Sequence, residues 1–310
     1  MAARRTPARV NATWVVIIAA MAMTVFSAQT PAPSPPARHV VEADDHPLTV
    51  WARVPPAPRE AVLLIHGRTW SSLPDFDLQV PGLRRSVMSS LAARGIAAYA
   101  VDLRGYGATP RDASGWLTPA RAAADIAHVL AWIAGRHATI GRPAVVGWSR
   151  GAAIGQLAVQ RAPRLASSLV LFGFAFEPGS RFADLALARV PVRARNTEAA
   201  ARSDFISPRV TAPAVIRAFV EHALRADPVL VDLRGEDEFN ALDPARVEVP
   251  VLLIHGDRDP MVTSELVAKM GGAFPRAPRT VVLAGADHAA HLESTHEQWV
   301  EAVDAFVSGN

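Results

Sequence analysis

Short apolar runs that alternate with helical patterns constrain the fold of this chain more than any other feature. The runs 61–67 (AVLLIHG), 96–101 (IAAYAV) and 144–148 (AVVGW) are apolar almost throughout, as in strands that are buried on both faces of a sheet. Helical patterns such as 82–95 and 118–136 lie between these runs. The alternation predicts an α/β fold with a doubly wound, mostly parallel sheet.

One segment, between about residues 177 and 248, breaks this alternation. It is rich in arginine and proline and carries short helical patterns such as 213–226. The alternation resumes at 249–260 and continues to a last helical pattern at 296–309. We therefore predict one α/β domain over 39–310, with an inserted helical cap at about 177–248.

The first residues of the chain are organised differently from the rest. Residues 1–30 combine a basic start with an apolar run at 14–26, which is shorter than the roughly 20 residues that a membrane span needs. Residues 31–38 contain four prolines and are typical of an extended linker. This layout predicts a secretory signal, with an uncleaved N-terminal anchor as the alternative. We expect a periplasmic or secreted protein, or one that is held at a membrane by its N-terminus.

Composition excludes several classes of function. The formal net charge is +3, and the pI of about 10.1 reflects arginine, since Lys269 is the only lysine. The chain has no cluster of basic residues with interleaved aromatic residues, so nucleic-acid binding is not expected. There is no cysteine, which excludes disulfides, thiolate metal ligands and a cysteine nucleophile.

The motif Gly-Trp-Ser-Arg-Gly (147–151) joins an apolar run to a helical pattern. It fits G-x-S-x-G, in which a sharp strand-to-helix turn exposes a serine at the edge of a sheet. The helix N-terminus favours negative charge that develops beside the serine. We therefore interpret Ser149 as a nucleophile. A glycine-rich turn with a surface serine is the structural alternative.

Two later apolar runs end in loops that carry the partners a serine nucleophile needs. Asp257 and Asp259 follow the run that begins at residue 249, and His288 and His291 follow the run 279–285. A serine hydroxyl is weakly nucleophilic and requires a base that a third group orients. The chain order Ser, Asp, His, with each member just after a buried strand, predicts that all three meet at one edge of the sheet.

With these motifs, the chain resembles the α/β-hydrolase family over about 39–308, most weakly in the insertion. The resemblance implies the catalytic triad Ser149, Asp259 and His288. In the family the acid commonly lies in G-x-x-D after the penultimate strand, which favours Asp259 and leaves Asp257 to fix the turn. No cofactor is implied.

The resemblance also implies an oxyanion hole made of two backbone N–H groups. One is that of Arg150, directly after the nucleophile. The other follows the His-Gly that ends an early strand, at Arg68 with Thr69 as the alternative. The histidine of the family usually follows a glycine-containing turn, as His288 does, and His291 is expected to pack nearby.

Other residues around these loops are given structural or substrate-binding roles. The stretch 102–109 (DLRGYGAT) resembles a structural loop of the family, so Asp102 and Arg104 are assigned no chemistry. Trp70 and Trp148 flank the predicted site and are candidates to line an apolar pocket, or to belong to the core.

Several functions remain open from the sequence. We expect a serine hydrolase that cleaves a carboxylic ester or related acyl bond of a small molecule, of the carboxylesterase type. A cofactor-free perhydrolase or haloperoxidase-like enzyme, or a carbon–carbon bond hydrolase, would use the same triad. A non-catalytic binding member of the fold is the alternative outside enzymes. A metal site is not expected, because the spacing of His288 and His291 matches no zinc motif.

Arginines near the predicted site suggest a preference for anionic substrates. Arg68 and Arg150 lie in the two loops above, and the insertion adds Arg193, Arg195, Arg202 and Arg209. If several face a pocket, they would favour a carboxylate near the scissile ester. Solvated surface arginines are the alternative.

Overall fold

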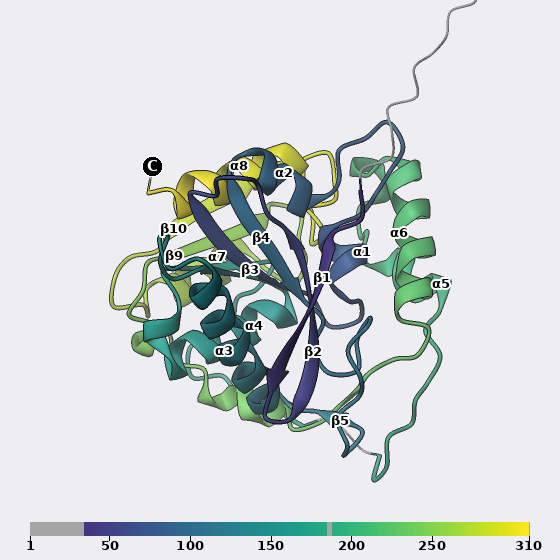
Figure 1. Ribbon diagram of the computed structural model, residues 1–310, viewed down its shortest axis with the longest axis horizontal. Helices are drawn as coiled ribbons and strands as arrows, with labels where there is room; N and C mark the ends of the chain where they lie inside the picture. Colours follow the sequence, from purple (N-terminus) through teal and green to yellow (C-terminus); the bar gives the residue numbers. More distant parts are fainter. Residues whose placement is uncertain (1–33, 185–187, 310) are drawn as a thin grey trace, which may run out of the picture. The chain divides into compact units, whose positions relative to one another are not determined.

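Eight strands form one sheet in the computed structural model, which describes residues 34–184 and 188–309 (Figure 1). These strands are β1 (Ala37–Ala43), β2 (His46–Arg53), β3 (Glu60–Ile65), β4 (Ile96–Val101), β6 (Ala144–Trp148), β7 (Leu169–Phe172), β9 (Val251–Gly256) and β10 (Arg279–Leu283). Their order across the sheet is β1-β2-β4-β3-β6-β7-β9-β10. Only the pairs β1–β2 and β2–β4 are antiparallel. The prediction of a mostly parallel α/β sheet is confirmed.

Helices cover both faces of this sheet (Figure 1). They are α1 (Ser72–Phe76), α2 (Val87–Ala93), α3 (Pro119–Arg136), α4 (Arg150–Arg161), α5 (Glu198–Ser203), α6 (Pro213–Ala226), α7 (Ser264–Gly271) and α8 (His296–Val307). One core cluster contains side chains of α3, α4 and α7, and the other contains side chains of α2 and α8. The sheet therefore separates two hydrophobic cores, as the doubly wound prediction requires.

Strand β3 shows why the central strands are apolar at every position. Leu63 and Ile65 belong to one core cluster, and Val62 and Leu64 belong to the other. Successive side chains of a strand point to opposite faces of the sheet. A strand with helices on both sides must therefore be apolar at every position. All four side chains are fully buried.

Local capping explains where the helices begin. Thr118 Oγ1 accepts a hydrogen bond from Arg121 N at the start of α3, with Pro119 in the first helical position. The predicted helix at 82–95 is shorter in the structure and begins after Ser86, whose hydroxyl accepts from Ser89 N at 2.9 Å. The prediction was wrong for 82–86, where the chain turns at residues 81–82 between bridged residues 80 and 83, and residue 86 bridges residue 77.

Between β7 and β9 the chain leaves the sheet. This segment contains α5, α6 and the short strand β8 (Asp232–Leu233), which pairs with β5 (Trp116–Leu117). Figure 1 shows α5 and α6 together beside α1. Short 3₁₀ helices complete it, at Pro208–Val210, Glu236–Ala241 and Pro244–Arg246, and a further one, Pro163–Leu165, precedes β7.

Part of the predicted organisation lies outside the described residues. The signal or anchor predicted for 1–30 and the first residues of the linker 31–38 are not among them, nor are residues 185–187 of the insertion. In the parts of the chain that the structure describes, no helix is long and apolar enough to cross a membrane.

Candidate active site

Ser149 lies at the sharp turn from β6 into α4. Its φ is 55°, one of few positive values at a non-glycine residue among the described residues. A Cβ atom on Gly147 would overlap the Gly151 carbonyl oxygen, and one on Gly151 would overlap the Ile65 and His66 carbonyl oxygens. Both glycines are therefore required by close backbone approach, and the turn holds Ser149 in a strained conformation at the N-terminus of α4.

His288 and Asp259 are hydrogen bonded to each other. His288 Nδ1 lies 2.8 Å from Asp259 Oδ2, and both side chains are buried. The other carboxylate oxygen, Asp259 Oδ1, accepts from Met261 N at 2.9 Å, which fixes its orientation. With Nδ1 donating to the carboxylate, Nε2 is the nitrogen that can take a proton.

Trp148 joins this pair to the serine turn. Its indole N–H donates to the backbone oxygen of His288 at 2.9 Å, and the two rings lie 5.5 Å apart between centroids. On another side, a Cβ atom on Gly173 would come within 3.2 Å of the His288 ring. The residue that precedes Ser149 therefore holds the histidine beside the turn, with no room for a larger residue at the end of β7.

The alternative residues of the two loops have other partners. Asp257 Oδ1 accepts from Gly285 N at 2.7 Å and so ties the β9 loop to the turn after β10. His291 is fully buried, with its ring centroid 4.6 Å from that of Trp148 and 5.2 Å from that of Phe172. Burial holds the pKa of His291 well below its usual range. His291 therefore packs as a neutral ring in the core.

The loop after β3 carries the Arg68 and Thr69 N–H groups, and His66 and Tyr106 each bond a carbonyl oxygen of this loop. Leu103 N donates to His66 Nε2 at 3.2 Å, so Nδ1 carries the hydrogen and donates to the Gly67 carbonyl oxygen at 2.9 Å. Burial lowers the pKa of His66 to about 4, which keeps it neutral. Tyr106 donates its hydroxyl hydrogen to the Arg68 carbonyl oxygen.

These two bonds set the direction of the peptide units on either side of Arg68. In a trans peptide the N–H points opposite to the preceding C=O. The Arg68 and Thr69 N–H groups therefore point away from His66 and Tyr106, and neither has a hydrogen-bond partner among the described residues. Both alternatives predicted for the second oxyanion donor are available in this geometry. At the start of α4, the N–H groups of Arg150 and Gly151 have no backbone partner among the described residues either, whereas Ala152 N donates to Ser149 O.

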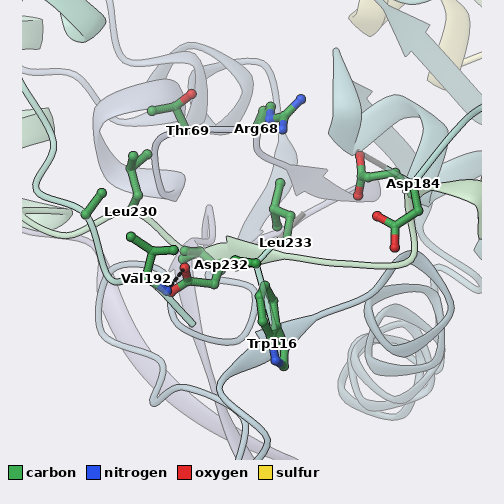
Figure 2. A pocket seen from close by; sticks show the side chains of 12 residues that line it. Arg68, Thr69, Trp116, Asp184, Val192, Leu230, Asp232 and Leu233 are labelled. Carbon is green, nitrogen blue, oxygen red and sulfur yellow. Dashed lines mark hydrogen bonds between the residues drawn. The ribbon is translucent and has the colours of Figure 1, made fainter. Parts of the chain in front are cut away.

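A cavity of about 370 Å³ opens between this loop and the insertion (Figure 2). Figure 2 shows Arg68 and Thr69 on one wall and Trp116 on the opposite wall. Apolar side chains such as Val192 and Leu230 make up most of the lining, with carboxylates at Asp184, Asp232 and Glu236. Trp70 and Trp148 are buried in the core and are not among the lining residues.

Most of the arginines considered as anion-binding groups have other surroundings. Arg150 is buried and pairs with Glu236, with 2.8 Å between Nη2 and Oε1. Arg202 pairs with Glu198 on the surface of α5. The arginines at 193, 195 and 209 are exposed and do not line the cavity, which leaves Arg68 as its arginine.

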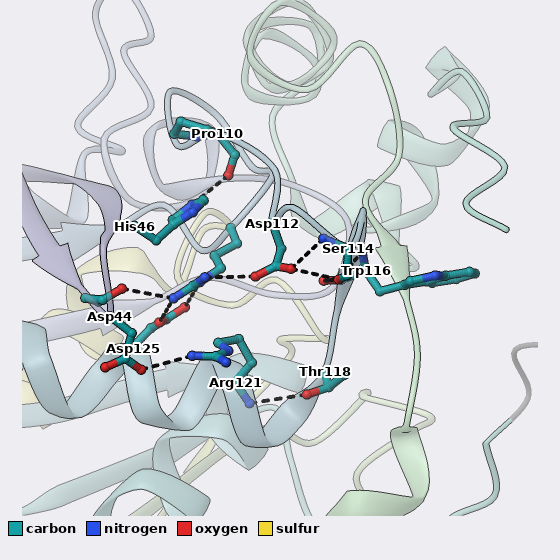
Figure 3. Close-up of polar contacts among 11 residues, drawn as sticks. Asp44, His46, Pro110, Asp112, Ser114, Trp116, Thr118, Arg121 and Asp125 are labelled. Atoms are coloured by element: carbon teal, nitrogen blue, oxygen red, sulfur yellow. Dashed lines mark hydrogen bonds and ion pairs between the residues drawn. The ribbon is translucent and has the colours of Figure 1, made fainter.

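Residues 102–109, the glycine turn after β4, are braced by buried ion pairs (Figure 3). Arg104 bonds both oxygens of Asp125, at 2.7 and 2.8 Å, and also Asp112 at 2.8 Å. Asp102 accepts from the Trp51 indole and from the Ala108 and Ser72 N–H groups. Both residues therefore hold the turn in place.

Comparison with known families adds the decisive observation. A family model described as "Alpha/beta hydrolase family" matches residues 62–303. The chain belongs to the α/β-hydrolase family. A search of curated proteins finds no match.

Solved α/β-hydrolase structures share this fold at low sequence identity. A thioesterase domain from the curacin biosynthetic pathway is 16% identical, with a TM-score of 0.64, over 89% of this chain and 100% of that chain. A serine hydrolase involved in carbazole degradation is 19% identical, with a TM-score of 0.62 and the same two coverages. An epoxide hydrolase from Vigna radiata is 18% identical, with a TM-score of 0.63, over 89% of this chain and 99% of that chain. These similarities show the hydrolase fold alone.

Sequence reasoning missed the residues that hold this α/β-hydrolase site from outside the sheet. Glu236 pairs with the arginine after the serine, and Asp204 and Asp227 bond the loop after β3. One signal was available for Asp227, which directly follows the long helix α6, where a carboxylate opposes the helix dipole. No comparable signal marks Glu236. In the described parts of the chain, no group of three or more His, Asp or Glu side chains is arranged to hold a metal ion.

Proposed function

We propose that this protein hydrolyses a carboxylic ester or a closely related acyl bond through an acyl-enzyme. The observation that carries the proposal is the 2.8 Å bond between His288 and Asp259, held by Trp148 beside the strained Ser149 turn. A serine nucleophile, a histidine base and an orienting acid are the groups that serine hydrolases use for acyl transfer. Epoxide hydrolases of this fold use an aspartate nucleophile, and the serine at position 149 argues against that chemistry.

The first half-reaction acylates the serine. Ser149 Oγ attacks the carbonyl carbon of the substrate while its proton passes to His288 Nε2, and Asp259 stabilises the resulting imidazolium. The carbonyl oxygen becomes negatively charged and accepts hydrogen bonds from Arg150 N–H and from the Arg68 or Thr69 N–H. The tetrahedral intermediate then expels the alcohol, which takes the proton from His288.

The second half-reaction restores the enzyme. His288 takes a proton from a water molecule as its oxygen attacks the acyl carbon. The acid product leaves as the proton returns to Ser149 Oγ. The cavity beside Arg68, about 370 Å³ and mostly apolar, is suited to one small acyl or alcohol group.

The decisive test compares the full chain with Ser149→Ala. We expect covalent labelling by a fluorophosphonate and turnover of a series of chromogenic esters and thioesters of increasing acyl length. The variant should lose both, because it lacks the hydroxyl group that is acylated. Labelling that survives the substitution places the nucleophile elsewhere, and labelling without turnover of any ester or thioester excludes the acyl hydrolase.

We further propose that the protein acts outside the cytoplasm. The basic start and apolar run of residues 1–30, followed by the proline-rich linker, support this proposal. Mass spectrometry of protein from the native host should find an N-terminus between about residues 26 and 39. An intact Met1 or Ala2 on a membrane-bound species would instead favour the anchor.

A further inference from the structure

Four carboxylates, three of them buried and that of Asp204 half-buried, surround the loop of residues 67–72, which carries the Arg68 and Thr69 N–H groups. The hydrogen bonds are Gly67 N to Asp75 Oδ2 (3.1 Å), Trp70 Nε1 to Asp204 Oδ2 (2.7 Å), Ser71 N to Asp227 Oδ2 (2.8 Å) and Ser72 N to Asp102 Oδ1 (3.0 Å). Two of these carboxylates, Asp204 and Asp227, belong to the insertion. The loop is therefore held from the sheet side and from the insertion side at once.

Asp227 joins this loop to the glycine turn after β4 through its two oxygens, as Asp102 does through Ser72 N and Ala108 N, but Asp227 comes from the insertion. While Oδ2 accepts from Ser71 N, Oδ1 accepts from Gly107 N, also at 2.8 Å. Its side chain is almost completely buried. The loop after β3 and the glycine turn after β4 thus share one carboxylate that comes from neither of them.

The glycine turn links Asp227 to the two candidate oxyanion donors, the Arg68 and Thr69 N–H groups. Gly107 has a φ of 51°, and a Cβ atom there would overlap the Asp102 carboxylate, so the turn has little freedom. Its neighbour Tyr106 donates its hydroxyl hydrogen to the Arg68 carbonyl oxygen. Since the Arg68 carbonyl and the Thr69 N–H belong to one peptide unit, a shift of the turn rotates that N–H.

Stability alone does not explain a carboxylate at this position. Asp227 follows the last residue of α6, where the negative end of the helix dipole disfavours an anion. Burial raises the pKa of Asp227 to about 6, although both N–H bonds act to lower it. A raised pKa means that ionising this group in the folded protein costs stability at neutral pH.

We propose that Asp227 is a positioning residue that docks the insertion onto the loop after β3 and so sets the Arg68 and Thr69 N–H groups for the developing oxyanion. The inference rests on the proposed acyl transfer, because it assigns Asp227 to the oxyanion donors of that reaction. It makes assembly of the oxyanion hole depend on the docked insertion, so Asp227 acts through the loop and does not touch the substrate.

The test replaces Asp227 with asparagine, which keeps the shape but offers an amide N–H₂ where one of the two backbone N–H groups needs an acceptor. We expect kcat for the best chromogenic ester to fall about 100-fold, the size of effect that follows loss or about 1 Å misplacement of an oxyanion donor. KM should change less than about threefold, because the donors act mainly in the transition state. The affinity for a boronic acid transition-state analogue should fall in parallel with kcat.

The matched control is Asp243→Asn in the same insertion. Asp243 caps a short 3₁₀ helix through Ala245 N and makes no described bond to the loop of residues 67–72. It should leave kcat, KM and boronic acid affinity near wild type. Tyr106→Phe tests the same linkage from its other end and removes only the hydroxyl group, so it remains informative if Asp227→Asn does not fold. Tyr106→Phe should lower kcat by a smaller factor than Asp227→Asn does, and it should leave KM unchanged.

The outcomes separate this inference from the proposed function. A wild-type protein that neither turns over esters nor reacts with fluorophosphonate overturns the acyl transfer and, with it, the role of Asp227. If the wild type is active and a folded Asp227→Asn keeps its kcat and its boronic acid affinity, the positioning role alone is wrong. Equal losses in Asp227→Asn and Asp243→Asn would also overturn it, and so would an unchanged kcat in Tyr106→Phe.

Discussion

The carboxylates in the two halves of this site differ in how far along the chain their hydrogen-bond partners lie. At the sheet edge, Asp259 is paired with His288, 29 positions along the chain, and both follow neighbouring strands of one sheet. In the insertion, Asp204 and Asp227 meet the loop of residues 67–72 across 134 and 156 positions. The first half follows from the sheet alone, whereas the second exists only when the insertion is docked. The sheet-edge half thus carries the acid and the base of the proposed reaction. The insertion half holds the loop whose N–H groups are proposed to bind the oxyanion.

The largest expected effect comes from the sheet-edge carboxylates. Asp259→Asn should lower kcat by about 10³- to 10⁴-fold, because an amide in place of the carboxylate no longer stabilises the imidazolium or holds the correct tautomer. Its control is Asp257→Asn, which loses part of a turn contact to Gly285 N and should stay within about tenfold of wild type. Steady-state kinetics with circular dichroism of both variants make the measurement. The reverse order would show that Asp257 is the acid and that the sheet-edge half has been misread.

Most of the sheet-borne architecture could be predicted from the sequence, because it depends on local patterns. A strand buried on both faces must be apolar at every position, so β3, β4 and β6 stand out as runs. Capping residues marked the start of α3. Residues 82–86 were misread because their helical spacing was outweighed by an isolated bridge and by the Ser86 cap.

The insertion half of the site could not be predicted in the same way. The Arg150–Glu236 pair and the Asp227 bridge join segments whose separation along the chain carries no periodic signal. Arginine is so common in this chain that Arg150 could not be told from a surface residue. Such contacts are decided by how the insertion packs, and a motif of adjacent residues does not encode that packing.

Glu293 tests the cost of burying a carboxyl group in the sheet-edge half, since it lies in the loop that carries His288. Burial, and then the hydrogen bond to Asp287, raise the pKa of Glu293 to about 9, so the folded protein holds it protonated at neutral pH. A raised pKa gives stability that is complete below about pH 4.5 and is lost as the pH rises through 9. Glu293→Gln removes this loss and should stabilise the protein by about 3 kcal/mol at pH 7, with almost no difference near pH 4.5.

Chemical denaturation at several pH values checks the Glu293 prediction. Glu301→Gln, on the exposed surface of α8, is the control and should stay within about 0.5 kcal/mol of wild type throughout. A difference for Glu293→Gln that does not change with pH would mean that the folded protein holds this carboxyl group ionised.

Asp204 provides the corresponding experiment in the insertion. Burial raises its pKa to about 6, although the Trp70 indole hydrogen bond acts to lower it. The stability linked to this group is therefore present below about pH 3.8 and lost as the pH rises through 6. Asp204→Asn keeps an acceptor for the indole, so its stability relative to wild type should be about 2 kcal/mol more favourable at pH 8 than at pH 4.

The kinetics of Asp204→Asn then separate the two carboxylates of the insertion. Because Asp204 bonds a side chain and not a backbone N–H of the loop, kcat should fall less than in Asp227→Asn. Glu198→Gln on the surface of α5 removes a charge from the same region and serves as the control. An equal fall in kcat for Asp204→Asn and Asp227→Asn would show that the loop responds to any loss of docking contacts.

The smallest effect is expected where the two halves meet, at the pair of Arg150 and Glu236. Glu236→Gln keeps one neutral acceptor for the buried guanidinium and should cost about 1 kcal/mol of stability. It also removes a negative charge from the cavity wall and leaves the charge of Arg150 uncompensated beside the serine. The variant should therefore raise kcat/KM for a hemi-ester of a dicarboxylic acid a few-fold relative to its neutral methyl ester, and salt should reduce this gain because screening acts within about 10 Å at 0.1 M. Asp237→Asn, at an exposed neighbouring position, is the matched control for a change of charge alone. If both variants shift the preference equally, the charge acts at long range, and Glu236 does not shield the substrate from Arg150.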